Sequence, residues 1–191
     1  FSEAFTIADY ERHVAASNDA GGPLSIYVHV PYCRSLCYYC ACNKVITRHE
    51  ARAERYLAVL LREIAMQGAL FDRNRLVEQL HFGGGTPTYL DKPQLAALMD
   101  QLRASFTFDE SDEREFSIEV DPRTVDAERI RELWDLGFNR LSLGIQDFNE
   151  DVQKAVNRAQ SPAEVQALMD SARESGFGSI SFDLIYGLPH Q

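Results

Sequence analysis

The chain has 191 residues, 45% of them hydrophobic, which is enough to bury a sizeable core as one domain or a large piece of one. Its formal net charge of -10 argues against a general nucleic-acid-binding surface, which would need Lys and Arg side chains to meet phosphates. No apolar run approaches the roughly 20 residues that span a bilayer and no signal peptide is visible, so we expect a cytoplasmic protein outside any membrane.

The first 30 residues predict a short helix followed by a buried strand. Weak apolar markers indicate the helix over residues 1–17, and turn-forming residues 18–23 end it, so we treat 1–23 as a helical segment ahead of a domain over 24–191. The apolar run from Leu24 to Val30 predicts the strand. Pro31 then removes an amide donor and turns the chain into a loop.

This loop holds every cysteine of the chain: Cys33, Cys37, Cys40 and Cys42. A disulfide framework would need an oxidising compartment, and nothing in the sequence indicates secretion. Structural zinc usually takes cysteine pairs from two separated turns, and the sequence has no second pair. Soft thiolates on one loop suit an iron–sulfur cluster, because neighbouring residues can each reach a different iron, and we favour this interpretation.

Strand and helix patterns alternate through the rest of the chain. Apolar residues at helical spacing, with capping residues, predict helices over residues 50–70, 91–102, 126–136 and 161–176. Apolar or alternating runs predict strands over residues 76–82, 115–120, 141–145 and 180–186. This order indicates βαβ crossovers and a parallel sheet.

The unusual side chains fall where the predicted strands end. They are the cysteine loop, Gly83 to Gly85, Glu119 with Asp121, Gln146 with Asp147, and Asp183. Periodicity does not decide whether the sheet closes: barrels build their sites on this edge, whereas a doubly wound open sheet places ligands mainly at its switch point. Contributions from five strands favour an α/β fold of the partial TIM-like barrel type, with five β/α units.

The glycine triplet Gly83-Gly84-Gly85 follows the second strand directly. Backbone without side chains can turn tightly or approach a ligand closely. The triplet is not a P-loop, because the Gly-Lys-Ser/Thr ending is absent. Taken alone, it fits a tight turn as well as a binding loop.

Two carboxylates near strand ends are candidate ligands for a small molecule. Glu119 takes the polar alternate position of its strand and can accept hydrogen bonds from ribose hydroxyls or an ammonium group, although a surface carboxylate beside a turn is the common alternative. Asp183 lies between Phe182 and Leu184, so we expect it to be buried and therefore paired.

Three further side chains carry a weaker signal. Gln146 and Arg158 are more often solvated than ligands when judged singly. His29 shares a strand face with Tyr27, two residues before it. A lone histidine there is more often a core residue, but near a cluster it can donate a hydrogen bond that tunes the reduction potential.

The CxxxCxxC pattern of Cys33, Cys37 and Cys40 resembles the signature of the radical S-adenosylmethionine enzymes, and Tyr39 fits the family's aromatic residue before the third cysteine. The resemblance implies that these three thiolates hold a [4Fe-4S] cluster whose fourth iron binds S-adenosylmethionine. It also implies that the glycine triplet contacts the amino end of that molecule. Cys42 is additional to the pattern.

Further stretches resemble, within that superfamily, the family of oxygen-independent coproporphyrinogen III oxidases. They are YVHVPYCRSLCYYCACNKVITR, LHFGGGTPTYL, SIEVDPR, GFNRLSLGIQDF, VNR and FDLIYGLP. Haem-handling paralogues share the barrel and CxxxCxxC but lack the fourth cysteine, so Cys42 favours the oxidases. The resemblance implies that the last barrel strand, the remaining contacts and a C-terminal domain lie beyond Gln191.

The oxidase family binds two S-adenosylmethionine molecules. Tyr27, Gly84 and Glu119 match contacts to the cluster-bound molecule. The positions that match contacts to the second are Tyr39, Gly85, Thr86, Gln146, Arg158 and Asp183. No catalytic residue is assigned, and Cys42 and His29 are the candidates for that role.

The implied reaction turns two propionates of coproporphyrinogen III into vinyl groups through a 5′-deoxyadenosyl radical, giving protoporphyrinogen IX. We expect a monomer that needs an unidentified electron donor and acceptor. Arg34, Lys44 and Arg48 are candidates for binding the tetracarboxylate, although solvated surface charge explains them equally well. The alternatives are a haem-binding or haem-delivery paralogue with the same barrel and cluster, and a structural zinc protein.

Overall fold

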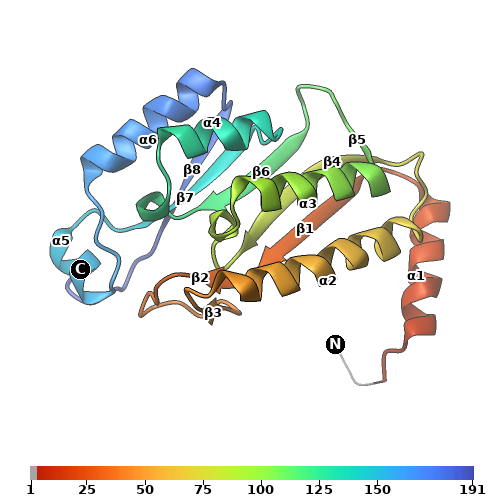
Figure 1. The fold of residues 1–191 in the computed structure, drawn as a ribbon, viewed down its shortest axis with the longest axis horizontal. Helices are drawn as coiled ribbons and strands as arrows, with labels where there is room; N and C mark the ends of the chain where they lie inside the picture. Colours follow the sequence, from red (N-terminus) through yellow and green to blue (C-terminus); the bar gives the residue numbers. More distant parts are fainter. Residues whose placement is uncertain (1–3) are drawn as a thin grey trace.

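The computed structural model describes residues 4–191, which form a parallel sheet with helices packed on it (Figure 1). The main strands are β1 (Leu24–Val30), β4 (Leu76–Gly84), β6 (Glu115–Val120), β7 (Arg140–Gln146) and β8 (Ser179–Leu184). The helices are α1 (Ile7–Ala20), α2 (Glu50–Gly68), α3 (Lys92–Ser105), α4 (Ala127–Asp135), α5 (Glu150–Ala155) and α6 (Pro162–Ser175). Shorter elements are the strands β2 (Tyr32–Cys33), β3 (Val45–Ile46) and β5 (Thr107–Phe108), and the 3-10 turns η1 (Pro87–Tyr89) and η2 (Pro122–Thr124).

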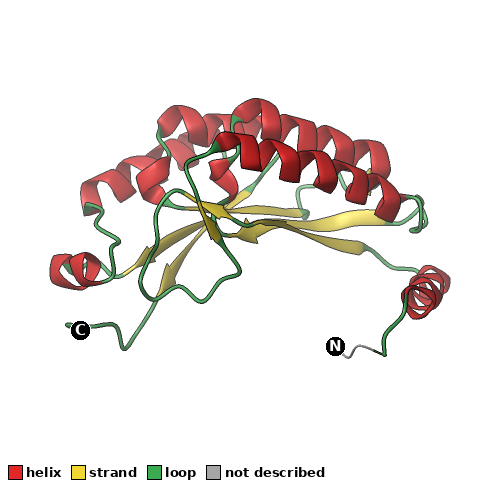
Figure 2. Cartoon of the chain, turned by 60° about the horizontal axis from the view of Figure 1, so that its bottom comes forward, coloured by secondary structure: helices red, strands yellow, loops and turns green. Residues whose placement is uncertain are grey.

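The five main strands lie in the order β1-β4-β6-β7-β8, and every pairing between them is parallel. Order in the sheet therefore equals order in the sequence. The crossover helices α2, α3, α4 and α6 cover the same face of the sheet (Figure 2). A doubly wound sheet would reverse its strand order and place helices on both faces, so this winding is that of a β/α barrel.

The hydrophobic core lies between the sheet and these helices. Alternate strand residues such as Val28, Phe82 and Ile118 are almost fully buried there, because successive side chains of a strand point to opposite faces. The ring of Phe82 meets that of Phe138 edge-on, with centroids 5.1 Å apart. The opposite, open face of the sheet carries polar side chains, and Glu119 lies on it.

The predicted helix caps are confirmed. Asp91 accepts a hydrogen bond from the backbone amide of Gln94, whose side chain bonds back to the amide of Asp91. Ser161 and Glu164 form the same capping box at the start of α6. Such boxes satisfy amide donors that the first turn of a helix leaves free, and they fix where the helix starts.

The first helix differs from its prediction. It runs over Ile7–Ala20, and residues 1–3 of the predicted helix lie outside the described residues. The turn-forming residues therefore act later than expected, at Gly21, whose φ of 69° ends the helix. Across residues 4–191, none of the helices combines the length and the apolar character needed to cross a membrane.

The predicted burial of Asp183 is wrong. Phe182 and Leu184, expected to bury this strand, are 38% and 63% exposed, and Asp183 itself is exposed. The physical reason is that β8 is the edge strand of the sheet, paired with β7 on one side only among the described residues. The expected partner does exist, because Ser142 Oγ lies 3.1 Å from the Asp183 carboxylate.

Candidate cluster and cofactor site

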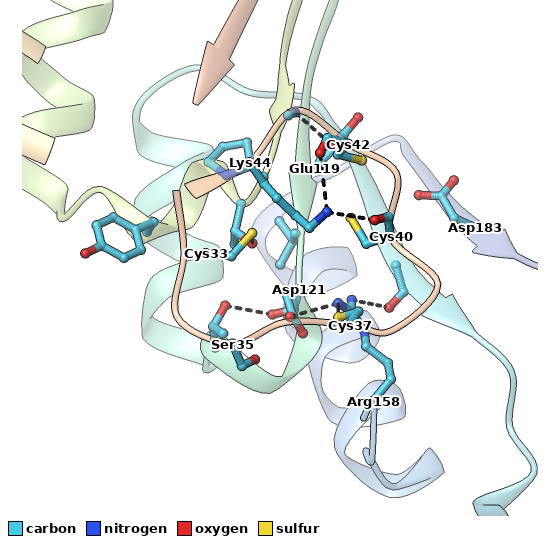
Figure 3. Close-up of a pocket in the computed structure, with 18 of the residues that line it drawn as sticks. Cys33, Ser35, Cys37, Cys40, Cys42, Lys44, Glu119, Asp121, Arg158 and Asp183 are labelled. Carbon is cyan, nitrogen blue, oxygen red and sulfur yellow. Dashed lines mark hydrogen bonds and ion pairs between the residues drawn. The ribbon is translucent and has the colours of Figure 1, made fainter. Parts of the chain in front are cut away.

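A cavity of about 470 Å³ opens at the carboxyl ends of the strands (Figure 3). It is lined by the cysteine loop, by the glycine turn (residues 83–85) at the end of β4, and by the ends of β6, β7 and β8. Predicted site residues among its lining are Cys33, Cys37, Cys40, Cys42, Tyr39, Gly84, Gly85, Thr86, Glu119, Gln146, Arg158 and Asp183. Tyr27 and His29 lie beside this wall on β1, where the Tyr27 hydroxyl is 3.0 Å from His29 Nδ1.

Backbone and side-chain hydrogen bonds hold the cysteine loop in shape. Its two ends pair as the short strands β2 and β3, and the amide of Val45 donates to Pro31 at 2.7 Å. Lys44 Nζ donates to the carbonyls of Cys40 and Cys42, at 2.7 and 3.4 Å. The ammonium group therefore closes the loop on itself, which is a different role from the substrate contact considered for it.

The four sulfur atoms have different surroundings. Cys37 is 9% exposed and is the most buried, whereas Cys42 is exposed. Cys33 Sγ lies 3.4 Å from the Thr86 hydroxyl. Burial raises the pKa of the Cys33 thiol, and the hydrogen bond with Thr86 opposes that shift. Within residues 4–191, no three His, Cys, Asp or Glu side chains gather as a site for a single metal ion.

A buried ion network lies directly below Cys37. Asp121 is paired with Arg123 at 2.7 Å and with Arg158 at 3.0 Å. Burial opposes ionisation of Asp121, but the hydrogen bond from Arg123 and the charges of both guanidinium groups lower its pKa. The sequence identified Asp121 and Arg158 but missed Arg123, although the Asp-Pro-Arg run that directly follows β6 contained it.

The glycine turn brings backbone close to three parts of the site. A Cβ on Gly83 would lie 2.8 Å from the Glu119 carboxylate and 3.0 Å from the Tyr27 ring. Gly84 has a φ of 116°, which favours glycine, and a Cβ on Gly85 would lie 2.8 Å from the backbone of Pro31. Glycine is therefore needed at these positions because the backbone packs closely against neighbouring groups, which a tight turn alone does not require.

Glu119 is held in place from two sides. One carboxylate oxygen accepts a hydrogen bond from the amide of Gly84 at 3.2 Å, and the other lies 3.1 Å from His81 Nε2. The ring of His81 stacks on that of Tyr27, with centroids 5.7 Å apart. The sequence placed Glu119 and Tyr27 correctly on this face but missed His81, which links them.

The far side of the cavity is formed by the ends of β7 and β8. Gln146 has a φ of 71°, a conformation uncommon for residues other than glycine. Arg158 donates to the carbonyl of Gly144 at 2.7 Å, while its buried Nε has no hydrogen-bond partner among residues 4–191. Arg158 is also among the residues that line the cavity, and a guanidinium in that position can receive an anionic group such as a carboxylate.

The candidate cations at the mouth are placed differently from one another. Arg34 lies 3.6 Å from Glu50 and over the ring of Tyr89, so its charge is partly satisfied. Lys44 is used within the cysteine loop. Arg48 is exposed.

Thiols gathered on one loop, at the carboxyl edge of a singly wound parallel sheet and beside a glycine turn, define a barrel enzyme domain of the cluster-binding class. Residues 27–191 match the family model of the Radical SAM superfamily, and the chain belongs to that superfamily. Membership implies a [4Fe-4S] cluster and S-adenosylmethionine as cofactors. The site fits both, because it offers soft thiolate ligands next to a cavity with polar walls.

Comparisons with known proteins agree with the resemblance stated from the sequence. The chain is 50% identical to oxygen-independent coproporphyrinogen III oxidase of Pseudomonas aeruginosa and 44% identical to that of Synechocystis, matching 100% of this chain but 42% and 40% of those proteins. A solved structure of coproporphyrinogen III oxidase from Escherichia coli, described as a radical SAM enzyme, is 49% identical, with a TM-score of 0.93 over 100% of this chain and 43% of that one.

More distant structures show the fold alone. A radical S-adenosylmethionine methyltransferase from Kitasatospora setae aligns with a TM-score of 0.59 at 15% identity, over 91% of this chain and 33% of that one. The predicted partial barrel is therefore confirmed. The chain spans about two fifths of the length of the curated relatives it matches.

Proposed function

We propose that the chain is the cluster-binding part of an oxygen-independent coproporphyrinogen III oxidase, which oxidatively decarboxylates two propionates of coproporphyrinogen III to vinyl groups and yields protoporphyrinogen IX. The observation that carries the proposal is 50% identity along the whole chain to a relative of that name, combined with a cavity lined by all four cysteines. Cys42, which separates this family from haem-handling paralogues, lines the same cavity.

Cys33, Cys37 and Cys40 are the proposed ligands of the cluster, and Cys42 is not a ligand. Tyr27, Gly84 and Glu119 are the proposed contacts of the cluster-bound S-adenosylmethionine. For a second S-adenosylmethionine molecule, the proposed contacts are Tyr39, Gly85, Thr86, Gln146, Arg158 and Asp183. The carboxylate of Glu119 suits an ammonium group or ribose hydroxyls, whereas the guanidinium of Arg158 suits a carboxylate.

When bound, the two cofactors supply one-electron reduction and a 5′-deoxyadenosyl radical that removes a hydrogen atom from a propionate. The protein positions the reactants and excludes water and oxygen. Cys37, Asp121 and Arg158 are buried side chains in the wall of the cavity. The glycine turn lets backbone approach the bound molecule more closely than side chains would allow.

The electron balance requires two redox partners. Cleavage of S-adenosylmethionine takes up one electron, so a donor must reduce the cluster. Loss of carbon dioxide from the substrate radical releases one electron as the vinyl group forms, so an acceptor must remove it. A reducing compartment, as in the cytoplasm, suits the four free thiols.

The proposal is tested with the full-length protein, reconstituted with iron and sulfide without air. We expect iron and sulfide in the proportions of a [4Fe-4S] cluster, reductant-dependent cleavage of S-adenosylmethionine, and conversion of coproporphyrinogen III to protoporphyrinogen IX by mass spectrometry. Intact substrate despite a complete cluster, together with tight haem binding, would instead establish the haem-handling alternative. Zinc without iron would establish a structural zinc protein.

Single cysteine variants separate the proposed ligands from Cys42. Cys33→Ser, Cys37→Ser and Cys40→Ser should each lose most of the iron and sulfide, because a serine hydroxyl is a poorer ligand for the cluster than a thiolate. Cys42→Ser is the matched control on the same loop and should retain the cluster. Loss of the cluster in Cys42→Ser would contradict the assignment of ligands.

A further inference from the structure

Two guanidinium groups, those of Arg123 and Arg158, lie within hydrogen-bond distance of the sulfur of Cys37, and Figure 3 shows Arg158 beside it. Arg123 Nη2 lies 3.5 Å and Arg158 Nη1 lies 3.4 Å from Cys37 Sγ. Both distances are within the range of a hydrogen bond to sulfur. Among residues 4–191, these guanidinium donors reach Cys37 alone of the four cysteines, whereas Cys33 faces the neutral hydroxyl of Thr86.

Both groups are fixed in position by further hydrogen bonds. Arg123 donates to both oxygens of Asp121, at 3.0 and 2.7 Å, and to the carbonyl of Asn157 at 2.9 Å. Arg158 donates to Asp121 at 3.0 Å and to the carbonyl of Gly144 at 2.7 Å. Neither guanidinium can rotate away from the sulfur without breaking bonds made in a buried site, which is costly.

The charges of this network do not cancel. Two guanidinium groups, which stay protonated in proteins, face one carboxylate, so the network carries one net positive charge next to Cys37. Asp121 and Arg158 are each 7% exposed, so water screens that charge little.

We propose that Arg123 and Arg158, aligned by Asp121, set the reduction potential of the cluster by donating hydrogen bonds to the thiolate of Cys37. This inference rests on the cluster of the proposed function. Reduction adds one electron, and part of that negative charge spreads onto the ligand sulfurs. N–H donors and positive charge stabilise the reduced cluster more than the oxidised one, so they raise its potential and make reduction by a donor easier.

Arg123 gives the clearer test, because Arg158 is also a proposed contact of S-adenosylmethionine. The full-length protein is reconstituted without air, and its cluster is followed by EPR during a redox titration with no S-adenosylmethionine present. For Arg123→Gln we expect at least a threefold fall in the ratio of reduced to oxidised cluster at a fixed potential. A tenfold fall would correspond to 59 mV for this one-electron couple. Arg123→Lys keeps the positive charge but loses the planar set of N–H donors. Its cluster should have a reduction potential between those of Arg123→Gln and the unchanged protein.

Arg129→Gln is the matched control. Arg129 is also partly buried, pairs with Glu132 at 2.8 Å and donates to the backbone carbonyl of Leu90. It lies on α4, and none of its hydrogen bonds within residues 4–191 involves sulfur. The cluster of Arg129→Gln should have the same reduction potential as that of the unchanged protein. An unshifted potential in Arg123→Gln with full iron content, or an equal shift in Arg129→Gln, would overturn the inference.

A second measurement does not depend on variants. Unchanged full-length protein carrying ¹⁵N-arginine is examined by pulsed EPR in the reduced state, where nitrogen hydrogen-bonded to a ligand sulfur should show a hyperfine coupling. No ¹⁵N coupling would overturn the inference even if Arg123→Gln failed to take up the cluster. A protein that shows the coupling and the shift but leaves coproporphyrinogen III intact would disprove the proposed reaction and leave this role of Arg123 standing.

Discussion

His81 contacts three side chains on the open face of the sheet, those of Glu119, Ser117 and Tyr27. Its Nε2 lies 3.1 Å from Glu119, its Nδ1 lies 2.5 Å from the Ser117 hydroxyl, and its ring stacks on Tyr27. Glu119 and Tyr27 are both proposed contacts of the same S-adenosylmethionine molecule. His81 therefore acts as a positioning residue, because it orients both without lining the cavity itself.

We expect His81→Ala to weaken binding of S-adenosylmethionine about three- to tenfold, since one lost hydrogen bond costs roughly 1 kcal/mol. Equilibrium binding to the reconstituted full-length protein measures the effect. Gln79→Ala is the control, because Gln79 lies two residues earlier on the same strand and bonds to Glu115 instead. Unchanged affinity in His81→Ala would show that Glu119 needs no support from His81.

At this scale, the sequence was most informative within regular strands. Alternation along β6 placed Glu119 on the polar face, and the structure confirms that placement. Arg123 follows Pro122 in a 3-10 turn, where no periodicity indicates direction, so its contact with Cys37 could not be predicted. The exposure of Asp183 was missed because local apolar neighbours do not reveal that a strand lies at the edge of a sheet.

Among the elements, the glycine turn and the cysteine loop depend on one another. The amide of Gly85 donates to the carbonyl of Val30 at 2.8 Å, which joins the turn to the end of β1. A Cβ on Gly85 would lie 2.8 Å from the carbonyl carbon and oxygen of Pro31 and 2.9 Å from the carbonyl oxygen of Tyr32. These are backbone atoms just before the first cysteine, and they cannot move without moving the loop.

Gly85→Ala should therefore reduce cluster uptake by at least half and destabilise the protein by about 1–3 kcal/mol, the usual range for overpacking. Iron and sulfide analysis after reconstitution measures the first effect and chemical denaturation measures the second. Gly178→Ala is the control, because a Cβ at Gly178 would meet nothing within 4 Å. If Gly85→Ala assembled the cluster as fully as Gly178→Ala, the close packing of the two loops would not matter for the site.

The long helices and strands could be predicted from the sequence, whereas the short strands could not. Both predicted capping boxes and all five main strands are present, because caps and apolar periods are local signals. The strands β2 and β3 have two residues each, too few to show a period. They exist because the cysteine loop closes on itself, which is a tertiary effect.

On the scale of the whole molecule, the sequence predicted parallel βαβ units but could not decide between closed and doubly wound sheets. The structure decides the question through strand order, which follows the sequence from β1 to β8, and through helices that share one face. Neighbouring helices on that face therefore also contact one another through their side chains. One such contact joins α3 and α4: Lys92 lies 3.4 Å from Glu132, which also pairs with Arg129 at 2.8 Å.

This contact predicts a specific dependence of stability on pH. Burial acts to raise the pKa of Glu132, but hydrogen bonds from Arg129 and Lys92 outweigh it and lower the pKa below the ordinary value of 4.5. A carboxyl with a lowered pKa in the folded state contributes its full stabilisation above pH 4.5 and loses it as the pH falls through the folded value. Partly exposed pairs of this kind contribute about 0.2–1 kcal/mol.

We therefore expect Glu132→Gln to lower the free energy of unfolding at pH 7 by up to about 1 kcal/mol. The difference from the unchanged chain should shrink steadily below pH 4.5, because protonation then removes the same charge from Glu132 itself. Urea titrations at several pH values measure it, with fluorescence from Trp134, the single tryptophan of this chain, which lies on α4 beside the contact. Glu54→Gln is the control, because it removes the same charge at an exposed position on α2. Its free energy of unfolding should differ little from that of the unchanged chain. A Glu132→Gln difference that stayed constant down to pH 3 would mean that shape and packing, and not charge, tie α4 to α3.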